Sequence, residues 1–185
     1  MSEIDCKNLE PTDLPTLQNI SAAAHGIKRI FLHWSAGNYG QAYDDYHICI
    51  DNDGQIYLMC DDLNQLKSHT WHRNTNSIGM AILGAAGASA NNGYDCDLGD
   101  QPPTSEQIES MSNAVAIICE ALQIPIDYDH VTTHEEIATE DGYGPGSGDP
   151  ETRWDLWYLE DYDGEMKPGG DVIRGKANWY AQKGF

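Results

Sequence analysis

Short apolar runs separated by turn-forming residues dominate the first half of the chain. Residues 28–34 read KRIFLHW and residues 77–83 read SIGMAIL, and both runs predict buried strands. Between them, residues 46–50 and 55–60 flank an Asn-Asp-Gly turn at 52–54. An Asp-Gly pair between two β-rich runs predicts a hairpin, because glycine accepts the positive φ of the turn. These runs therefore predict a strand, a hairpin and a second strand.

A three- and four-residue spacing of apolar positions is clearest between Thr104 and Leu122. The stripe consists of Ile108, Met111, Val115, Ile118 and Leu122. Such a one-sided stripe predicts a helix whose apolar face packs in the core. Thr104 and Gln107 fit a capping box at the start of this helix. A second, shorter helix is predicted near residues 14–24.

The order of the remaining segments defines the expected fold class. Residues 84–95 are rich in small residues and predict a loop, whereas 129–133 carry β-branched side chains typical of a short strand. A glycine-rich loop follows at 140–150, and 154–159 predicts a final helix or turn. Strand, hairpin, strand, helix, strand and helix in this order predict an α/β fold with a mixed central β-sheet flanked by helices.

The expected domain organisation is simple, because 185 residues suit one compact unit with a sizeable core. We expect an N-terminal lead-in at residues 1–26 and the main domain at 27–160. Residues 161–185 form a C-terminal extension that either packs on the domain or begins a linker.

Charge narrows the possible partners. The chain has 10 Lys and Arg against 30 Asp and Glu, which gives a formal net charge of −20. Such a chain repels DNA, RNA and anionic membrane surfaces, so we expect neither a nucleic-acid nor a membrane partner.

The N-terminus and the cysteines favour synthesis in a cytoplasm. The first residues have no basic segment followed by an apolar one, so no secretory signal is expected, and no run of 18 apolar residues predicts a transmembrane helix. The five cysteines are odd in number and form no C-x-x-C pair, which predicts mostly reduced thiols. They are Cys6, Cys49, Cys60, Cys96 and Cys119.

Two of the seven histidines are candidate metal ligands. His33 ends an apolar run, and side chains at strand ends often project into a cleft, although taken alone His33 fits a half-buried structural histidine better. His130 and His134 are four residues apart, but a strand would separate them by about 13 Å at about 3.3 Å per residue. One zinc ion cannot bind both, and His134, at the end of the strand, is the better candidate.

Asp149 could supply a third ligand across the glycine-rich loop, although Asp149-Pro150 also fits a surface turn. Three protein ligands from separate segments would leave a fourth position open, which is typical of catalytic zinc. Zinc lowers the pKa of a bound water to about 7 and polarises a carbonyl, which is chemistry suited to amide hydrolysis.

Four segments in one order resemble the type 2 N-acetylmuramoyl-L-alanine amidases, a family that includes amidase-type phage lysozymes and the peptidoglycan recognition proteins. The segments are IFLHWSAG at 30–37, YHICIDNDGQIY at 46–57, SHTWHRNTNSIGMAILG at 68–84, and VTTHEEI at 131–137 followed by GDPETRWDLW at 148–157. The resemblance therefore runs over most of the chain.

The resemblance implies roles for particular residues. His33, His134 and Asp149 would bind zinc, Tyr46 would lie beside the metal-bound water, and His69 would line the substrate groove. His47, on the other face of the Tyr46 strand, would be structural. Trp34 and Trp71 are candidates for the same groove, although both tryptophans also suit core packing.

Two positions depart from the family pattern. Ala81 stands where some members have a glutamate that acts as general base, which assigns the chain to the members that use a tyrosine. Ser147 stands where many members have a lysine, two residues before the third ligand. A serine hydroxyl would be a neutral oxyanion donor and a weaker one than lysine.

The resemblance implies a monomeric, zinc-dependent, bacteriolytic hydrolase that cuts peptidoglycan between N-acetylmuramic acid and L-alanine. A phage or prophage endolysin, made without a signal peptide and released to the cell wall, is the expected setting. A recycling enzyme that acts on wall fragments inside the cell is the alternative. A non-catalytic peptidoglycan-binding module and a different zinc peptidase remain competing functions.

Overall fold

A five-stranded mixed sheet forms the centre of the computed structural model, which describes residues 2–92 and 95–184. Its strands, in spatial order, are β5 (Ile56–Leu58), β4 (Ile48–Ile50), β6 (Ser77–Ile82), β2 (Arg29–Trp34) and β9 (Val131–Thr133). The four strands from β4 to β9 are parallel, and β5 is antiparallel at the edge. This arrangement confirms the predicted hairpin and the predicted mixed sheet.

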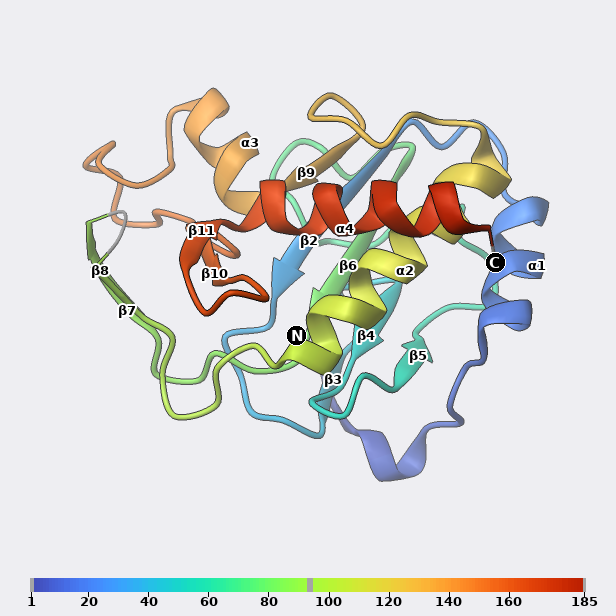
Figure 1. Ribbon diagram of the computed structural model, residues 1–185, viewed down its shortest axis with the longest axis horizontal. Helices are drawn as coiled ribbons and strands as arrows, with labels where there is room; N and C mark the ends of the chain where they lie inside the picture. The colour runs from blue at the N-terminus through green and yellow to red at the C-terminus, as the bar shows by residue number, and fades with distance from the viewer. Residues whose placement is uncertain (1, 93–94, 185) are drawn as a thin grey trace.

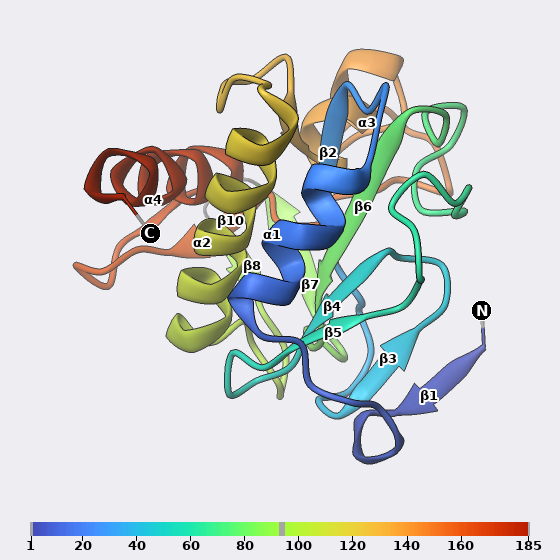
Figure 2. The ribbon, with the colours of Figure 1, turned by 90° about the vertical axis from the view of Figure 1, so that its right-hand side faces the viewer.

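Three helices cover one face of this sheet. They are α1 (Leu14–Ala23), α2 (Ser105–Leu122) and α4 (Gly169–Lys183), and Figure 2 shows all three on the same side of the strands. The fourth helix, α3 (His134–Asp141), begins directly after β9 and lies near one end of the sheet (Figure 1). The expected α/β class with flanking helices is therefore confirmed.

The two faces of strand β2 have different surroundings. Ile30, Leu32 and Trp34 belong to the main core, which the sheet shares with the helices. The alternate residues point to the other face, where Phe31 contacts His69 and His33 contacts Tyr46. Because side chains alternate along a strand, the register that buries the aliphatic residues also turns His33 away from the helices.

Helix α2 follows the predicted pattern closely. Thr104 is its N-cap and forms the predicted capping box with Gln107. The side-chain amide of buried Gln107 also donates to the carbonyls of Ile50, at 3.0 Å, and Leu83, at 2.7 Å. This side chain ties the start of α2 to the ends of β4 and β6.

The C-terminal part of the chain differs from the expectation. Residues 155–157 form a turn, which is one of the two forms expected for 154–159, but β10 (Tyr158–Glu160), which was not expected, then pairs with β11 (Met166–Pro168). Helix α4 was not expected, because its three glycines lower the intrinsic helix propensity. Packing against α2 offsets that cost, since Ile173 and Ala177 of α4 are fully buried in the main core.

Smaller elements complete the structure. They are β1 (Glu3–Asp5), η1 (Cys6–Asn8), β3 (Gln41–Tyr43), β7 (Ser89–Asn92) and β8 (Asp95–Asp97). Strand β7 lies in the segment expected to be a loop and pairs with β8, which begins at the last residue of that segment, while residues 93–94 lie outside the described residues. Within residues 2–92 and 95–184, no helix is long and apolar enough to cross a membrane.

Candidate metal site

Strand β2 and the first turn of α3 bring His33 and His134 together. β2 and β9 are parallel, with Leu32 opposite Thr133, so the residue that follows each comes to the same end of the sheet. His33 is fully buried, and His134 is the first residue of α3. The two imidazole rings are 4.8 Å apart between centroids. The structure thus joins the two histidines that the sequence selected.

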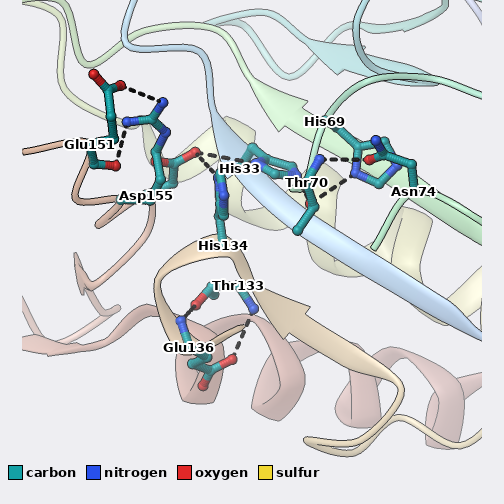
Figure 3. Close-up of polar contacts among 10 residues, drawn as sticks. His33, His69, Thr70, Asn74, Thr133, His134, Glu136, Glu151 and Asp155 are labelled. Carbon is teal, nitrogen blue, oxygen red and sulfur yellow. Dashed lines mark hydrogen bonds and ion pairs between the residues drawn. The ribbon is translucent and has the colours of Figure 1, made fainter. Parts of the chain in front are cut away.

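Asp155 completes the cluster. Its Oδ2 lies 3.2 Å from Nδ1 of His33 and 3.2 Å from Nδ1 of His134. Figure 3 shows the three side chains pointing toward one another from three separate segments. Donor atoms around a tetrahedral zinc with Zn–N of about 2.0–2.1 Å are about 3.3–3.4 Å apart, so these spacings fit such an ion. Two imidazoles and one carboxylate also match the donor set of catalytic zinc.

The charges of the cluster suit a divalent cation. Burial lowers the pKa of His33 to about 4 against the opposing effect of Asp155, so this imidazole is neutral at pH 7. Burial raises the pKa of Asp155, but hydrogen bonds from His134 and His33 outweigh it and leave the pKa well below its ordinary value. A charged carboxylate, only 14% exposed, beside neutral His33 is the combination of protonation states that metal binding requires.

Thr70 contacts the ring nitrogen of His33 that does not face Asp155. Its Oγ1 lies 3.3 Å from Nε2 of His33 and 3.0 Å from Nδ1 of His69, and its N–H donates to Oδ1 of Asn74 at 2.8 Å. An imidazole that binds a metal through Nδ1 carries its proton on Nε2, and Oγ1 of Thr70 can accept a hydrogen bond from that N–H. Thr70 has no signal in the sequence beyond its place in SHTWH, and only the fold brings it to His33.

The second ring nitrogen of His134 takes no part in the contacts of the cluster. Nε2 of His134 is buried, and it has no hydrogen-bond partner within the described part of the chain. Buried polar atoms are normally paired, so this nitrogen is an exception within the cluster.

Asp149, the expected third ligand, lies apart from the histidine–Asp155 cluster. Its side chain is exposed, and its Oδ1 accepts from the Glu151 N–H at 2.8 Å. Its own N–H donates to Oγ of Ser147, which is also exposed, at 3.1 Å. This is the surface-turn arrangement considered for Asp149-Pro150. The structure therefore brings Asp155, six residues later, to the position that the sequence assigned to Asp149.

Packing around Asp155 explains this difference. Trp154 stacks edge-on against Trp34, with ring centroids 4.8 Å apart, and Leu156 is fully buried in the main core. These contacts of the two neighbouring residues hold Asp155 at the end of the sheet. In the sequence, the only signal for the position of Asp155 is that it stands between a tryptophan and a leucine. Structural aspartates often have such neighbours as well.

Two cavities adjoin at the cluster. One has a volume of about 520 Å³ and includes Trp34, Tyr46 and Asp155 in its wall. The other, of about 580 Å³, includes Trp71, Tyr143 and Asp149. Ser68, His69, His134 and Arg153 line both cavities. Of the candidate ligands, His134 lines both cavities and Asp155 lines the first, so a substrate could extend from the cluster in two directions.

The remaining predicted residues lie around these cavities. Tyr46 is buried with its ring centroid 5.1 Å from that of His33, and burial raises its pKa well above the ordinary value, so its hydroxyl remains protonated. His69 is buried in the wall of both cavities. Trp34 is mainly a core residue with part of its surface in the first cavity. Trp71 is 63% exposed at the second cavity.

His47 differs from these residues. Its Nδ1 accepts from the Gly79 N–H at 3.0 Å, and its Nε2 donates to the Gln65 carbonyl at 2.7 Å. Both ring nitrogens therefore join backbone segments, as expected of a structural histidine.

Comparison with known proteins identifies the family. The model of the N-acetylmuramoyl-L-alanine amidase family matches residues 21–150. Because this match covers more than half of the chain, the chain belongs to that family. Asp155 and α4 lie beyond the matched residues. No curated protein sequence matches the chain significantly.

Solved structures with a partly similar fold include three proteins. The N-acetylmuramoyl-L-alanine amidase LysC from Clostridium intestinale URNW is 18% identical, with a TM-score of 0.45 over 60% of this chain and 72% of that one. The Ph2119 endolysin from Thermus scotoductus MAT2119 bacteriophage Ph2119 is 16% identical, with a TM-score of 0.46 over 61% and 74%. PGRP-Hd from Alvinella pompejana is 18% identical, with a TM-score of 0.41 over 60% and 74%.

The two candidate third ligands can be separated by substitution. We expect Asp155→Ala to lose most of its bound zinc, because the change removes the oxygen that faces both imidazoles. Asp149→Ala should retain zinc at the wild-type stoichiometry. The measurement is zinc content by atomic spectroscopy after dialysis against trace zinc. Zinc loss in Asp149→Ala together with retention in Asp155→Ala would restore the assignment made from sequence.

Proposed function

We propose that this chain hydrolyses the amide bond between N-acetylmuramic acid and L-alanine in peptidoglycan, with zinc bound by His33, His134 and Asp155. The observation that supports this most directly is the convergence of two imidazoles and a carboxylate where two cavities adjoin, in a member of an amidase family. When bound, zinc supplies a Lewis acid for the scissile carbonyl and lowers the pKa of a water.

Tyr46 is the proposed proton-carrying partner of this reaction. Its hydroxyl is held in the protonated form by burial and by the nearby charge of Asp155, so it acts as a hydrogen-bond donor and not as a base. A donor beside the cluster can orient the attacking water or donate to the departing L-alanine nitrogen. Ala81, opposite His33 in the neighbouring strand, has no group for either task.

Arg153 takes the electrostatic role that the sequence assigned to Ser147. Among the described residues lining the two cavities, Arg153 is the one lysine or arginine. It is paired with Glu151, but Glu151 is 80% exposed, so solvent screens this ion pair and the guanidinium remains available to a ligand. A cation between the cavities can stabilise the developing oxyanion or bind a carboxylate of the stem peptide.

The two cavities suggest how the substrate lies. One cavity would hold the sugar and the other the peptide, with the scissile bond over the cluster. Exposed Trp71 offers an aromatic face for one of these parts. An endolysin acting at the cell wall is the setting we propose, and the net charge of −20 makes the cation at Arg153 important for attracting an anionic stem peptide.

Product analysis tests this function. Purified peptidoglycan is digested with the zinc-loaded protein and with His33→Ala as a control. We expect new L-alanine amino groups, no new reducing sugar ends, and no reaction with the control. New amino groups at other peptide bonds would indicate a zinc peptidase. Binding without any cleavage would indicate a binding module, and either outcome would refute the proposal.

Arg153 and Ser147 can be compared directly. We expect Arg153→Gln to lower kcat/KM by about 10²-fold, the usual effect of losing one oxyanion donor, with zinc content unchanged. Ser147→Ala should keep a rate close to that of the wild type, because Ser147 is exposed and bonded within its own turn. The measurement is steady-state kinetics on a soluble muropeptide. The reverse pattern would return the oxyanion role to Ser147.

Tyr46→Phe isolates the tyrosine hydroxyl. Zinc content and substrate affinity should be preserved, whereas kcat should fall by about 10²–10⁴-fold, as is typical for the loss of a proton-transfer group. Kinetics and zinc analysis on the same preparation separate the two effects. A wild-type kcat in this variant would show that the hydroxyl takes no part in the reaction.

A further inference from the structure

Arg174 is a buried arginine on α4, and its hydrogen bonds lead toward the candidate metal site. Its Nη1 lies 2.8 Å from Oε2 of Glu136, and its Nη2 lies 2.7 Å from Oε1, which is a bidentate pair. Nη1 also donates to the Val131 carbonyl at 2.9 Å, and Nη2 to Oδ1 of Asp171 at 2.9 Å. One side chain thus holds both β9 and α3.

Glu136 carries this interaction to the first turn of α3. Its Oε2 accepts from the Thr133 N–H at 2.9 Å, and its own N–H donates to Oγ1 of Thr133 at 3.2 Å (Figure 3). His134 lies inside this capping box, directly after Thr133. Arg174 therefore contacts the chain on both sides of His134, at Val131 before it and at Glu136 after it.

The pair is well isolated from solvent. The Arg174 and Glu136 side chains are only 10% and 14% exposed, so the ion pair is weakly screened. The backbone of α4 packs directly on it, because a Cβ at Gly170 would collide with the Glu136 carboxylate and the Arg174 guanidinium. Removing Arg174 would leave the Glu136 carboxylate, two residues after His134, largely buried without its ion-pair partner.

We propose that Arg174 is a positioning residue for His134, so that α4, which lies outside the family match, sets the metal affinity of the site. This inference rests on the proposed function only in that zinc binds at His33, His134 and Asp155. Arg174 does not contact the cluster itself. It fixes the backbone of residues 131–136 and, through the capping box, the direction in which the His134 ring leaves α3.

The test is the zinc dissociation constant of the whole chain, measured by competition with a chromophoric chelator. We expect Arg174→Gln to raise this constant by about 10–100-fold, the usual effect of losing a group that orients a ligand. Arg174→Lys should cause a smaller loss, because an ammonium keeps the charge but cannot form the bidentate pair. Glu136→Gln should resemble Arg174→Gln, and the double variant should add little further loss, since both changes break one interaction.

Lys176→Gln is the matched control. Lys176 also lies on α4, but its ion pair is with Glu109 of α2. This variant should weaken the docking of α4 while leaving the zinc dissociation constant close to that of the wild type. Urea unfolding of the metal-free proteins measures how far each variant destabilises the fold. If Arg174→Gln does not fold, the comparison of Arg174→Lys with Lys176→Gln decides the question.

Two results would overturn the inference. One is an unchanged zinc dissociation constant in the folded Arg174 variants, and the other is an equal loss in Lys176→Gln, which would mean that α4 docking in general controls affinity. These two results differ from the result expected if only the proposed function is wrong. In that case the wild-type chain binds zinc and the Arg174 variants bind it more weakly, but peptidoglycan is not cleaved.

Discussion

The candidate site depends on one constraint: strand β2 is hydrogen-bonded to a parallel neighbour on each of its edges. β6 and β9 fix the register of β2, and the core beneath the helices takes Ile30, Leu32 and Trp34. A shift by one residue would move this aliphatic row to the face of the candidate site and turn His33 into the core. Because β9 is aligned with β2, the chain leaves the sheet at Thr133 and starts α3 with His134 beside His33.

Asp155 adds the carboxylate that makes the two histidines a candidate metal site. A carboxylate in a buried position is costly unless it is hydrogen-bonded or bound to a cation. Here the Nδ1 atoms of two imidazoles share one of its oxygens, and Trp154 and Leu156 anchor the backbone on either side. Desolvation keeps His33 neutral and the Asp155 carboxylate stays charged beside it, so this pair favours a positively charged ligand. A divalent ion would provide that charge, and this accounts for the form of the site without reference to any relative.

The parts of the structure that the sequence predicted are those with local causes. The strand containing His33, the Asp-Gly hairpin and the capped α2 follow from periodicity and turn chemistry, and His134 was selected because it ends a β-branched run. Asp155 could not be predicted in this way, because tertiary packing, and not a local sequence pattern, brings it to the histidines. The same applies to α4, whose glycines disfavour a helix locally, and to Thr70, which reaches His33 only through the fold.

The account centres on a zinc ion held by His33, His134 and Asp155, and anomalous diffraction from crystals of the zinc-loaded protein tests this most directly. The account predicts one strong anomalous peak at the zinc edge, in contact with Nδ1 of both histidines and with a carboxylate oxygen of Asp155. A peak bound by Asp149 in place of Asp155 would contradict the third ligand. The absence of any peak between the two histidines, at full zinc saturation, would contradict the metal site as a whole.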